Sequence, residues 1–145
     1  MTPILVDSSV LLDVITEDPT WGEWSADTLQ QLAEEAVLVI NPLIYAEVSI
    51  RYETIEELEA VLPIDLYRRE PLPWEAAFLA GKAFLEYRRR GGVKRAPLPD
   101  FYTCAHAAVR RYRLLTRDPS PCRPHFPTVS LIAPGRLVGE EPEAE

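Results

Sequence analysis

Short apolar runs alternate with longer helical segments along this 145-residue chain, and this alternation limits the folds that it can adopt. Runs that are apolar at every position are typical of strands buried on both faces of a parallel sheet. Parallel strands need crossover connections, which the intervening helices supply. The runs expected as strands are residues 3–6, 37–40, 63–66, 114–116 and 128–132. We therefore predict a three-layer α/β/α domain around a mostly parallel sheet of about five strands.

The spacing of apolar residues and the placement of capping residues predict the helices between these strands. The segments expected to be helical are residues 10–15, 25–36, 43–62 and 74–90, and a last helix that begins at Pro99 and Asp100. The third is expected to be one continuous helix, because its apolar residues follow a period of about 3.6. The last helix is expected to bury a stripe made of Phe101, Cys104, Ala105, Ala108, Val109 and Tyr112.

The chain is long enough for one domain with a full core, which we expect over residues 1–134. The polar and acidic segment that follows, residues 135–145, is expected to be flexible. No apolar run approaches the roughly 18 residues that a membrane span needs, and the first residues lack the basic region of a signal peptide. A cytoplasmic location is therefore expected.

The two cysteines are expected to be unpaired. Cys104 lies among alanines of the last helix, where a buried, reduced thiol is the simplest state, and Cys122 lies in a proline-rich loop. The chain has no CxxC pair, and His106 and His125 lack the spacing of zinc ligands. A zinc site is therefore not expected.

Four acidic residues stand where an apolar run ends or a helix begins: Asp7, Glu47, Asp100 and Asp118. Each has a local explanation, such as a helix cap for Asp100, a turn for Asp118 or an ion pair of Glu47 with Arg51. Asp7 and Asp118 each follow an expected strand, and ligands of parallel sheets bind at the carboxyl ends of the strands. Carboxylates gathered there at ~5 Å would repel by roughly 3 kcal/mol per pair unless a cation offset their charge. Such oxygen ligands suit Mg²⁺ or Mn²⁺ and indicate a metal-dependent nuclease.

The net charge of −8 and the pI of 4.8 argue against a nucleic-acid ligand, because phosphate contacts favour basic surfaces. A bound dication would offset part of the negative charge, however. Positive charge is also concentrated locally, in Arg88, Arg89, Arg90, Lys94 and Arg95. This run has two explanations, namely a favourable interaction with the end of a helix or contact with phosphate. Net charge therefore leaves nucleic-acid binding open.

Four blocks of this sequence resemble those of the PIN-domain ribonucleases, and in particular the toxins of VapBC-type toxin–antitoxin pairs. The blocks are ILVDSSVLLDV, IYAEVSIRY, PLPDFYTCAHAAV and LLTRDPSPCRPHFPTVSLIAP, which span residues 3–134 in the family's order. The chain departs from the family's pattern after Asp100. Family members often continue with small aliphatic residues, where this chain has Tyr102, Thr103, Cys104 and His106.

The resemblance implies that residues 1–134 form a nuclease domain that hydrolyses single-stranded RNA with the help of Mg²⁺ or Mn²⁺. The catalytic and metal-binding residues that it implies are Asp7, Glu47, Asp100 and Asp118. Asp7 and Asp100 would be the principal metal ligands, and the other two would complete the acidic cluster. Ser9 and Thr116 occupy positions where hydroxyl groups often support the metal or its water.

The resemblance also implies partners: a second copy of the chain in a homodimer, and a small antitoxin that places a C-terminal segment over the site. An arginine of such a segment could pair with the carboxylates. Two phosphoaspartyl classes of protein do not fit this sequence. A phosphoaspartyl phosphatase needs a second Asp two residues after the nucleophile, where this chain has Ser9. A receiver domain needs a Lys near the end of the last strand, whereas the two lysines of this chain, Lys82 and Lys94, lie elsewhere. A catalytically silent PIN-fold module that binds RNA or protein stays open.

Overall fold

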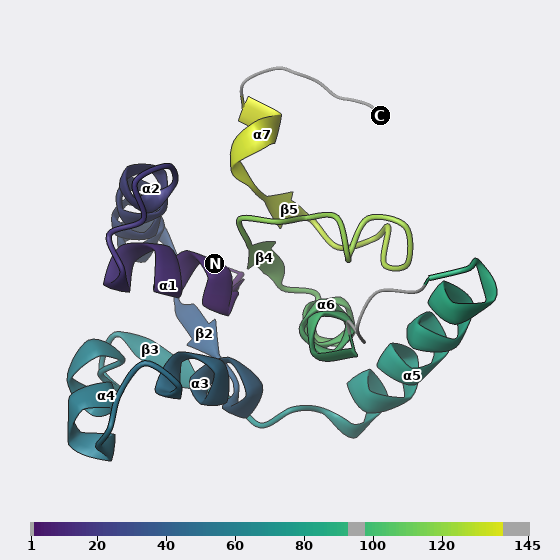
Figure 1. The fold of residues 1–145 in the computed structure, drawn as a ribbon, viewed down its shortest axis with the longest axis horizontal. Helices are drawn as coiled ribbons and strands as arrows, with labels where there is room; N and C mark the ends of the chain where they lie inside the picture. Colours follow the sequence, from purple (N-terminus) through teal and green to yellow (C-terminus); the bar gives the residue numbers. More distant parts are fainter. Residues whose placement is uncertain (1, 93–97, 138–145) are drawn as a thin grey trace.

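The structure, a computed structural model, describes residues 2–92 and 98–137. In these residues five strands form one sheet in the order β3-β2-β1-β4-β5, and every pair of neighbours is parallel (Figure 1). The strands are β1 (Ile4–Val6), β2 (Leu38–Ile40), β3 (Tyr67–Arg69), β4 (Arg113–Leu115) and β5 (Leu131–Ile132). The predicted parallel sheet is confirmed.

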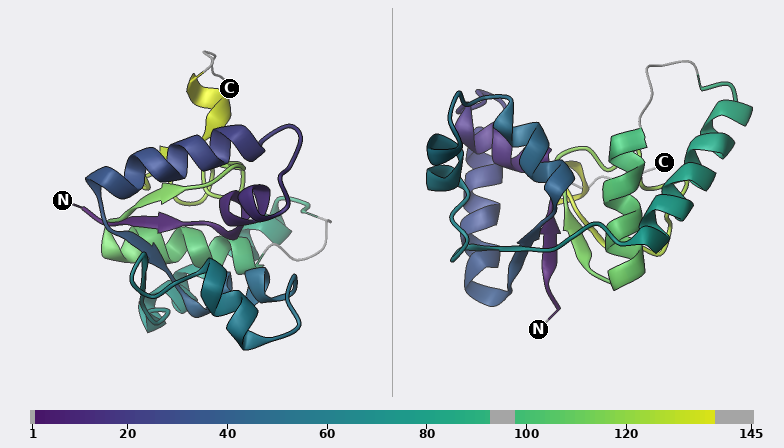
Figure 2. Two further views of the ribbon diagram at one scale, coloured as in Figure 1. Left: turned by 90° about the vertical axis from the view of Figure 1, so that its left-hand side faces the viewer. Right: turned by 90° about the horizontal axis from the view of Figure 1, so that it is seen from below.

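Helices cover both faces of the sheet (Figure 2). The described residues form α1 (Ser8–Ile15), α2 (Gly22–Glu35), α3 (Pro42–Ser49), α4 (Ile55–Val61), α5 (Trp74–Arg89), α6 (Leu98–Arg110) and α7 (Pro134–Leu137). Helices α1 and α2 lie on one face, and α5 and α6 pack together on the other. Helix α3 contacts both α1 and α6. The predicted three-layer α/β/α architecture is therefore confirmed.

Within the described residues, no helix combines the length and the apolar character that a membrane crossing requires.

Strand β1 occupies the middle of the sheet and pairs with β2 and β4. Its residues Ile4, Leu5 and Val6 are fully buried, as expected for a strand with helices on both sides. Because the strands are parallel, their carboxyl ends meet at one edge. There the backbone N–H of Asp7 donates to the carbonyl oxygen of Leu115 at 2.9 Å. The topology thus brings the residues after β1 and after β4 side by side.

The predicted continuous helix over residues 43–62 is wrong, because the segment forms two helices, α3 and α4. Thr54 starts α4 with a capping box, in which Thr54 Oγ1 accepts from the Glu57 N–H and Glu57 Oε1 accepts from the Thr54 N–H, both at 3.2 Å. Ile50 and Ile55, on either side of the break, are 83% and 62% exposed. The prediction relied on the period of the apolar residues. At these positions, however, the apolar side chains are exposed and do not stabilise a continuous helix, whereas the cap stabilises the start of α4 by about 1 kcal/mol.

The third and fifth strands also differ from their predicted bounds. Residues 63–66 form a turn, in which two backbone N–H groups donate to the carbonyl oxygen of Pro63, and β3 begins only at Tyr67. Ile64 is 63% exposed, whereas Tyr67 is buried, so the apolar residues of this stretch do not mark the strand. The strand predicted over residues 128–132 is limited to β5.

Some predictions fall outside the described residues. The flexible segment expected over residues 135–145 begins within α7, and residues 138–145 are not described. Of the basic run, Lys94 and Arg95 are not described, and Arg90 forms an ion pair with Glu86 at 3.3 Å. The division into a domain and a tail stays a prediction.

The prediction of two unpaired cysteines is wrong. Cys104 and Cys122 form a disulfide, with a distance of 5.6 Å between their Cα atoms, and both residues are 2% exposed. The bond links α6 to the loop after β4 across 18 positions of sequence. No local pattern announces such a pair, because the two residues meet only after α6 packs on the sheet.

Helix α6 buries more than the predicted stripe. Phe101, Cys104 and Ala105 are buried as predicted, and Ala108, Val109 and Tyr112 are only partly buried. Thr103, His106 and Ala107 are buried in addition. The reason is that α6 packs against both the sheet and α5, so that more than one side of the helix is covered.

Candidate active site

Asp7 lies between β1 and α1, and two hydroxyl groups hold its carboxylate. Ser9 Oγ and Thr116 Oγ1 donate to Asp7 Oδ2 at 2.7 and 3.0 Å. Asp7 occupies the N-cap position of α1, but its side chain makes no capping hydrogen bond. Capping therefore does not account for this carboxylate, which is oriented by hydroxyls from two different segments.

Glu47 reaches the same region from α3. Ser8 Oγ donates to Glu47 Oε1 at 2.7 Å, so that the partner of Glu47 is the residue next to Asp7 and not Arg51. Partial burial raises the pKa of Glu47, the bond from Ser8 opposes this rise, and the charge of Asp7 adds to it. A local ion pair on the surface of α3 therefore does not explain this residue.

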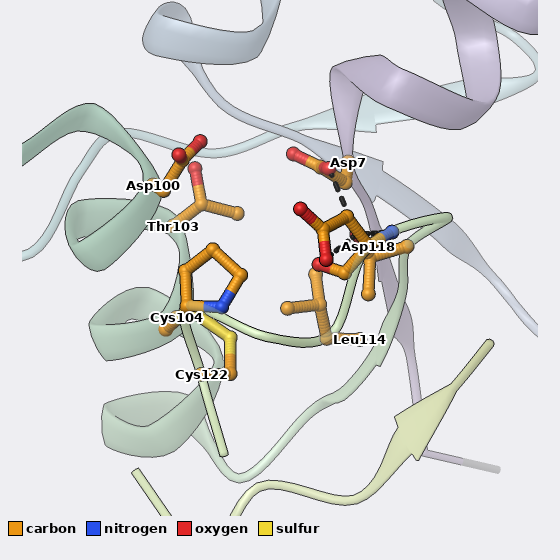
Figure 3. Close-up of a pocket in the computed structure, with 9 residues that line it drawn as sticks. Asp7, Asp100, Thr103, Cys104, Leu114, Asp118 and Cys122 are labelled. Carbon is orange, nitrogen blue, oxygen red and sulfur yellow. Dashed lines mark hydrogen bonds between the residues drawn. A yellow bond between two sulfur atoms is a disulfide. The ribbon is translucent and has the colours of Figure 1, made fainter. Parts of the chain in front are cut away.

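Asp100 stands in the first turn of α6, and its carboxyl group faces the end of β1 across a hollow (Figure 3). Desolvation of this carboxyl group, together with the negative charges of Asp7, Glu47 and Asp118, raises the pKa of Asp100 to about 6. The residue as a whole remains exposed to solvent. The other three predicted acids are thus close enough to oppose the ionisation of Asp100.

Asp118 lies in the loop after β4, and hydrogen bonds connect it to the same network. Its backbone N–H donates to Thr116 Oγ1 at 3.2 Å, so Thr116 joins the backbone of Asp118 to the carboxylate of Asp7. The N–H and the Oγ of Ser120 both donate to Asp118 Oδ1, at 3.1 and 2.8 Å. The turn expected at Asp118 is therefore present, and its carboxylate is held at the sheet edge.

Asp7, Asp100 and Asp118 line one hollow of about 20 Å³, together with Thr103 and Thr116 (Figure 3). A space of this size holds about one water molecule or one small ion. Glu47 is not part of the lining, but its hydrogen-bond partner Ser8 directly follows the lining residue Asp7. The structure therefore brings all four predicted acids to one edge of the sheet.

The donor atoms around this hollow suit a hard dication. Carboxylate and hydroxyl oxygens are the ligands that Mg²⁺ and Mn²⁺ prefer. In the part of the chain that the structure describes, no three His, Cys, Asp or Glu side chains are arranged to hold an ion as they stand. A bound dication would offset the repulsion between these carboxylates. The donor set around the hollow therefore fits the metal.

Sequence reasoning missed a buried ion pair that supports the site. Asp13 is 2% exposed and accepts two hydrogen bonds from the guanidinium of Arg117, both at 3.1 Å, and a third from Ser25 Oγ at 2.9 Å. Arg117 stands between Thr116 and Asp118, so this pair anchors their loop to α1. The criterion that selected the four acids, a carboxylate within apolar sequence, would also have selected Asp13 in VLLDVI.

Comparisons with known proteins agree with this geometry. The family model described as PIN domain matches residues 4–126. The chain therefore belongs to the PIN-domain family, as its sequence blocks predicted. A sequence search of curated proteins found no match.

Several solved structures share this fold. A chain of a toxin–antitoxin complex from Klebsiella pneumoniae has a TM-score of 0.64 at 19% identity, covering 87% of this chain and 94% of that one. A chain of the VapBC2 complex from Rickettsia felis, bound to a promoter DNA fragment, has a TM-score of 0.68 at 15% identity, covering 90% of this chain and 98% of that one. A chain of VapBC-1 from nontypeable Haemophilus influenzae has a TM-score of 0.67 at 14% identity, covering 90% and 97%. A chain of FitAcB from Neisseria gonorrhoeae has a TM-score of 0.62 at 20% identity, covering 89% and 96%. At these identities the likeness concerns the fold.

The charge of Asp100 is expected to cost stability in the metal-free protein. Because its pKa is about 6 in the folded state and 3.8 is its ordinary value, the folded state binds the proton more tightly. Stability from this group therefore falls as pH rises from about 4 to about 6. With EDTA present at about pH 8, Asp100→Asn should raise the melting temperature. The gain in the free energy of unfolding should be at most about 1 kcal/mol, because solvent screens the group. At about pH 4 the two proteins should melt alike.

The control for this measurement is Asp65→Asn, which changes an exposed acid far along the chain from the four. It should leave the melting temperature nearly unchanged at both pH values. A lower melting temperature for Asp100→Asn at the higher pH would contradict the repulsion inferred here.

The Asp13–Arg117 pair is expected to stabilise the fold. Arg117→Met leaves the buried carboxylate of Asp13 without its cation and should lower the free energy of unfolding by about 2–3 kcal/mol, less than for a fully buried pair because Arg117 is partly exposed. Urea unfolding measures the change. Arg123→Met, an exposed arginine of the same loop, is the matched control and should cost little. Equal stability of the two variants would show that the pair anchors nothing.

Proposed function

We propose that this PIN-domain protein is a Mg²⁺- or Mn²⁺-dependent endoribonuclease that hydrolyses phosphodiester bonds in single-stranded RNA. The observation that carries the proposal is the gathering of Asp7, Glu47, Asp100 and Asp118 at one sheet edge, where three of them hinder the ionisation of Asp100. A cluster of like charges costs stability, and such clusters are typical of sites that bind a cation or do chemistry.

In the proposed mechanism Asp7 and Asp100 are the principal metal ligands, and Glu47 and Asp118 complete the cluster. When bound, the dication polarises a phosphoryl oxygen and makes a water molecule more acidic. Thr116 and Ser9 orient the carboxylate of Asp7 through the two hydrogen bonds to Oδ2. Hydrolysis forms a bond from the water oxygen to phosphorus and breaks the bond to the leaving sugar oxygen, which gains a proton.

The RNA chain needs positive charge beyond the acidic hollow. Arg88 and Arg89, in the last turn of α5, are exposed and are candidates for phosphate contacts. The charge of the bound ion would attract phosphate in the hollow itself.

We further propose that the protein is a cytoplasmic toxin with a small antitoxin as its partner. Support comes from the fold, since one chain of similar structure belongs to a toxin–antitoxin complex from Klebsiella pneumoniae. An arginine from the C-terminal segment of such a partner would pair with the carboxylates and take the place of the metal charge.

We also propose that a second copy of the chain packs against the outer face of α5 in a homodimer. Trp74, Phe78 and Leu85 are 88%, 63% and 42% exposed. Their spacing of four and seven residues places them on one side of the helix. Large apolar side chains gathered on one face are typical of an interface, and a homodimer would bury them.

Purified protein is expected to cleave single-stranded RNA in Mg²⁺ or Mn²⁺ and to stop when EDTA is added. Asp7→Asn and Asp100→Asn should each lower the rate by about a hundredfold or more, because each removes a principal ligand. Asp65→Asn is the matched control and should cleave at the wild-type rate. Fragment patterns of a mixed RNA pool on a denaturing gel give the readout.

Cleavage that survives chelation, or that Asp100→Asn leaves unchanged, would count against the proposed mechanism. A folded wild-type protein that binds the dication but never cleaves RNA would favour the catalytically silent binding module instead.

Expression of the wild-type protein in a bacterium is expected to arrest growth, whereas Asp7→Asn at the same protein level is not. Growth curves and immunoblots measure the two quantities, and Asp65→Asn should arrest growth like the wild type. Growth arrest by the Asp7→Asn variant would show that the toxicity does not depend on the acidic cluster. Normal growth with the wild type would remove the proposed toxin role.

A further inference from the structure

The disulfide between Cys104 and Cys122 lies in the wall of the candidate site. Both residues line the same hollow as Asp7, Asp100 and Asp118 (Figure 3). Cys104 follows Asp100 by four residues and so stands about one turn further along the same side of α6. Cys122 follows Asp118 by four residues in the loop after β4. The bond therefore joins the two segments that carry acids on opposite sides of the hollow.

The stretch between Asp118 and Cys122 is stiff enough to transmit a constraint. The Cys122 N–H donates to the carbonyl oxygen of Pro119 at 3.1 Å, and Ser120 Oγ donates to Asp118 Oδ1 at 2.8 Å. Pro119 and Pro121 restrict the backbone further, because the ring of proline fixes φ. Fixing Cys122 on α6 therefore restricts where Asp118 can lie.

Two aromatic contacts between this loop and α6 lie beyond Cys122. Phe101 packs against His125 and Phe126, with ring centroids 5.0 and 6.5 Å apart. These contacts keep the end of the loop docked without the disulfide. The disulfide lies nearer to Asp118 along the chain than these aromatic contacts do. Its loss would therefore release the part of the loop that carries Asp118 from α6, while Thr116 and Arg117 still hold it to the sheet edge and to α1.

We propose that Cys104 and Cys122 are positioning residues of the metal site, whose disulfide holds Asp118 opposite Asp100 and thereby strengthens binding of the divalent cation. The inference rests on the proposed metal site. Thermodynamic linkage makes the effect reciprocal. If the disulfide raises the affinity for the ion by some factor, the bound ion shifts the equilibrium between disulfide and dithiol towards the disulfide by the same factor. The oxidation state of the pair would thus set the affinity of the site for the metal.

The chemical step is a thiol–disulfide exchange. A dithiol reductant supplies two electrons and two protons and closes to its own disulfide, while the S–S bond breaks and leaves two cysteine thiols. Disulfides of proteins in a reducing compartment are mostly transient, catalytic or redox-sensing. The pair therefore fits a role in regulating the site in the proposed cytoplasmic location.

Calorimetric titration with Mg²⁺ compares the oxidised and the dithiol-reduced wild-type protein. Mg²⁺ is the probe because this hard ion has little affinity for thiols. The reduced protein is expected to bind about five- to tenfold more weakly. Cys104→Ala/Cys122→Ala should bind like the reduced protein and be insensitive to reductant. A thermal melt of each sample establishes that it is folded, and reduction of the wild type tests the proposal even where the double variant does not fold.

The reciprocal measurement follows the disulfide itself. The wild-type protein is equilibrated in buffers of a dithiol and its disulfide at varied ratios, and alkylation with mass spectrometry gives the reduced fraction. Saturating Mg²⁺ should raise the dithiol-to-disulfide ratio needed for half reduction by the same factor as the loss of affinity. In Asp100→Asn, which lacks a proposed ligand, Mg²⁺ should have little effect on this ratio.

If the disulfide only stabilises the fold, the oxidised and the reduced protein, both folded, should bind Mg²⁺ with equal affinity, and Mg²⁺ should not shift the redox equilibrium. This result would overturn the proposed coupling alone. No binding of Mg²⁺ to the oxidised wild-type protein would overturn the proposed metal site as well. The two failures are therefore distinguishable.

Discussion

Carboxylates that repel one another lie at one edge of the sheet, and the surrounding structure has to hold them there. The parallel order of strands places Asp7 and Asp118 at neighbouring strand ends, and α3 and α6 bring Glu47 and Asp100 to the same edge. Desolvation, together with the negative charges of the other three acids, raises the pKa of Asp100. A fold driven by stability alone would separate these charges, so their convergence indicates a ligand that neutralises them.

The surrounding contacts oppose the tendency of these charges to separate. Hydroxyl groups of Ser9 and Thr116 fix the carboxylate of Asp7, and the bidentate pair of Arg117 with Asp13 fixes the loop that follows β4. The disulfide fastens the same loop to α6. Each of these links joins a segment that carries an acid to a well-packed element, which is how a site can be held ready before its ion binds.

The sequence predicted what depends on local pattern and failed where distant side chains decide. Apolar runs such as residues 3–6 predicted the buried strands, because a central parallel strand must be apolar on both faces. The break between α3 and α4 depends on the capping box of Thr54 and Glu57, and the apolar period that predicted one helix continues through it. The Cys104–Cys122 bond could not be predicted, because it depends on how α6 packs on the sheet. The predicted topology brought Asp7 and Asp118 to neighbouring strand ends, whereas the family resemblance placed Glu47 and Asp100 beside them.

A crystal of the oxidised protein soaked in Mn²⁺, measured for anomalous scattering, tests the central claim most directly. We expect a manganese peak in the hollow, with carboxylate oxygens of Asp7 and Asp100 at about 2.0–2.2 Å and Asp118 or Glu47 reached directly or through water. An empty hollow at saturating Mn²⁺, or manganese bound only elsewhere on the surface, would contradict it.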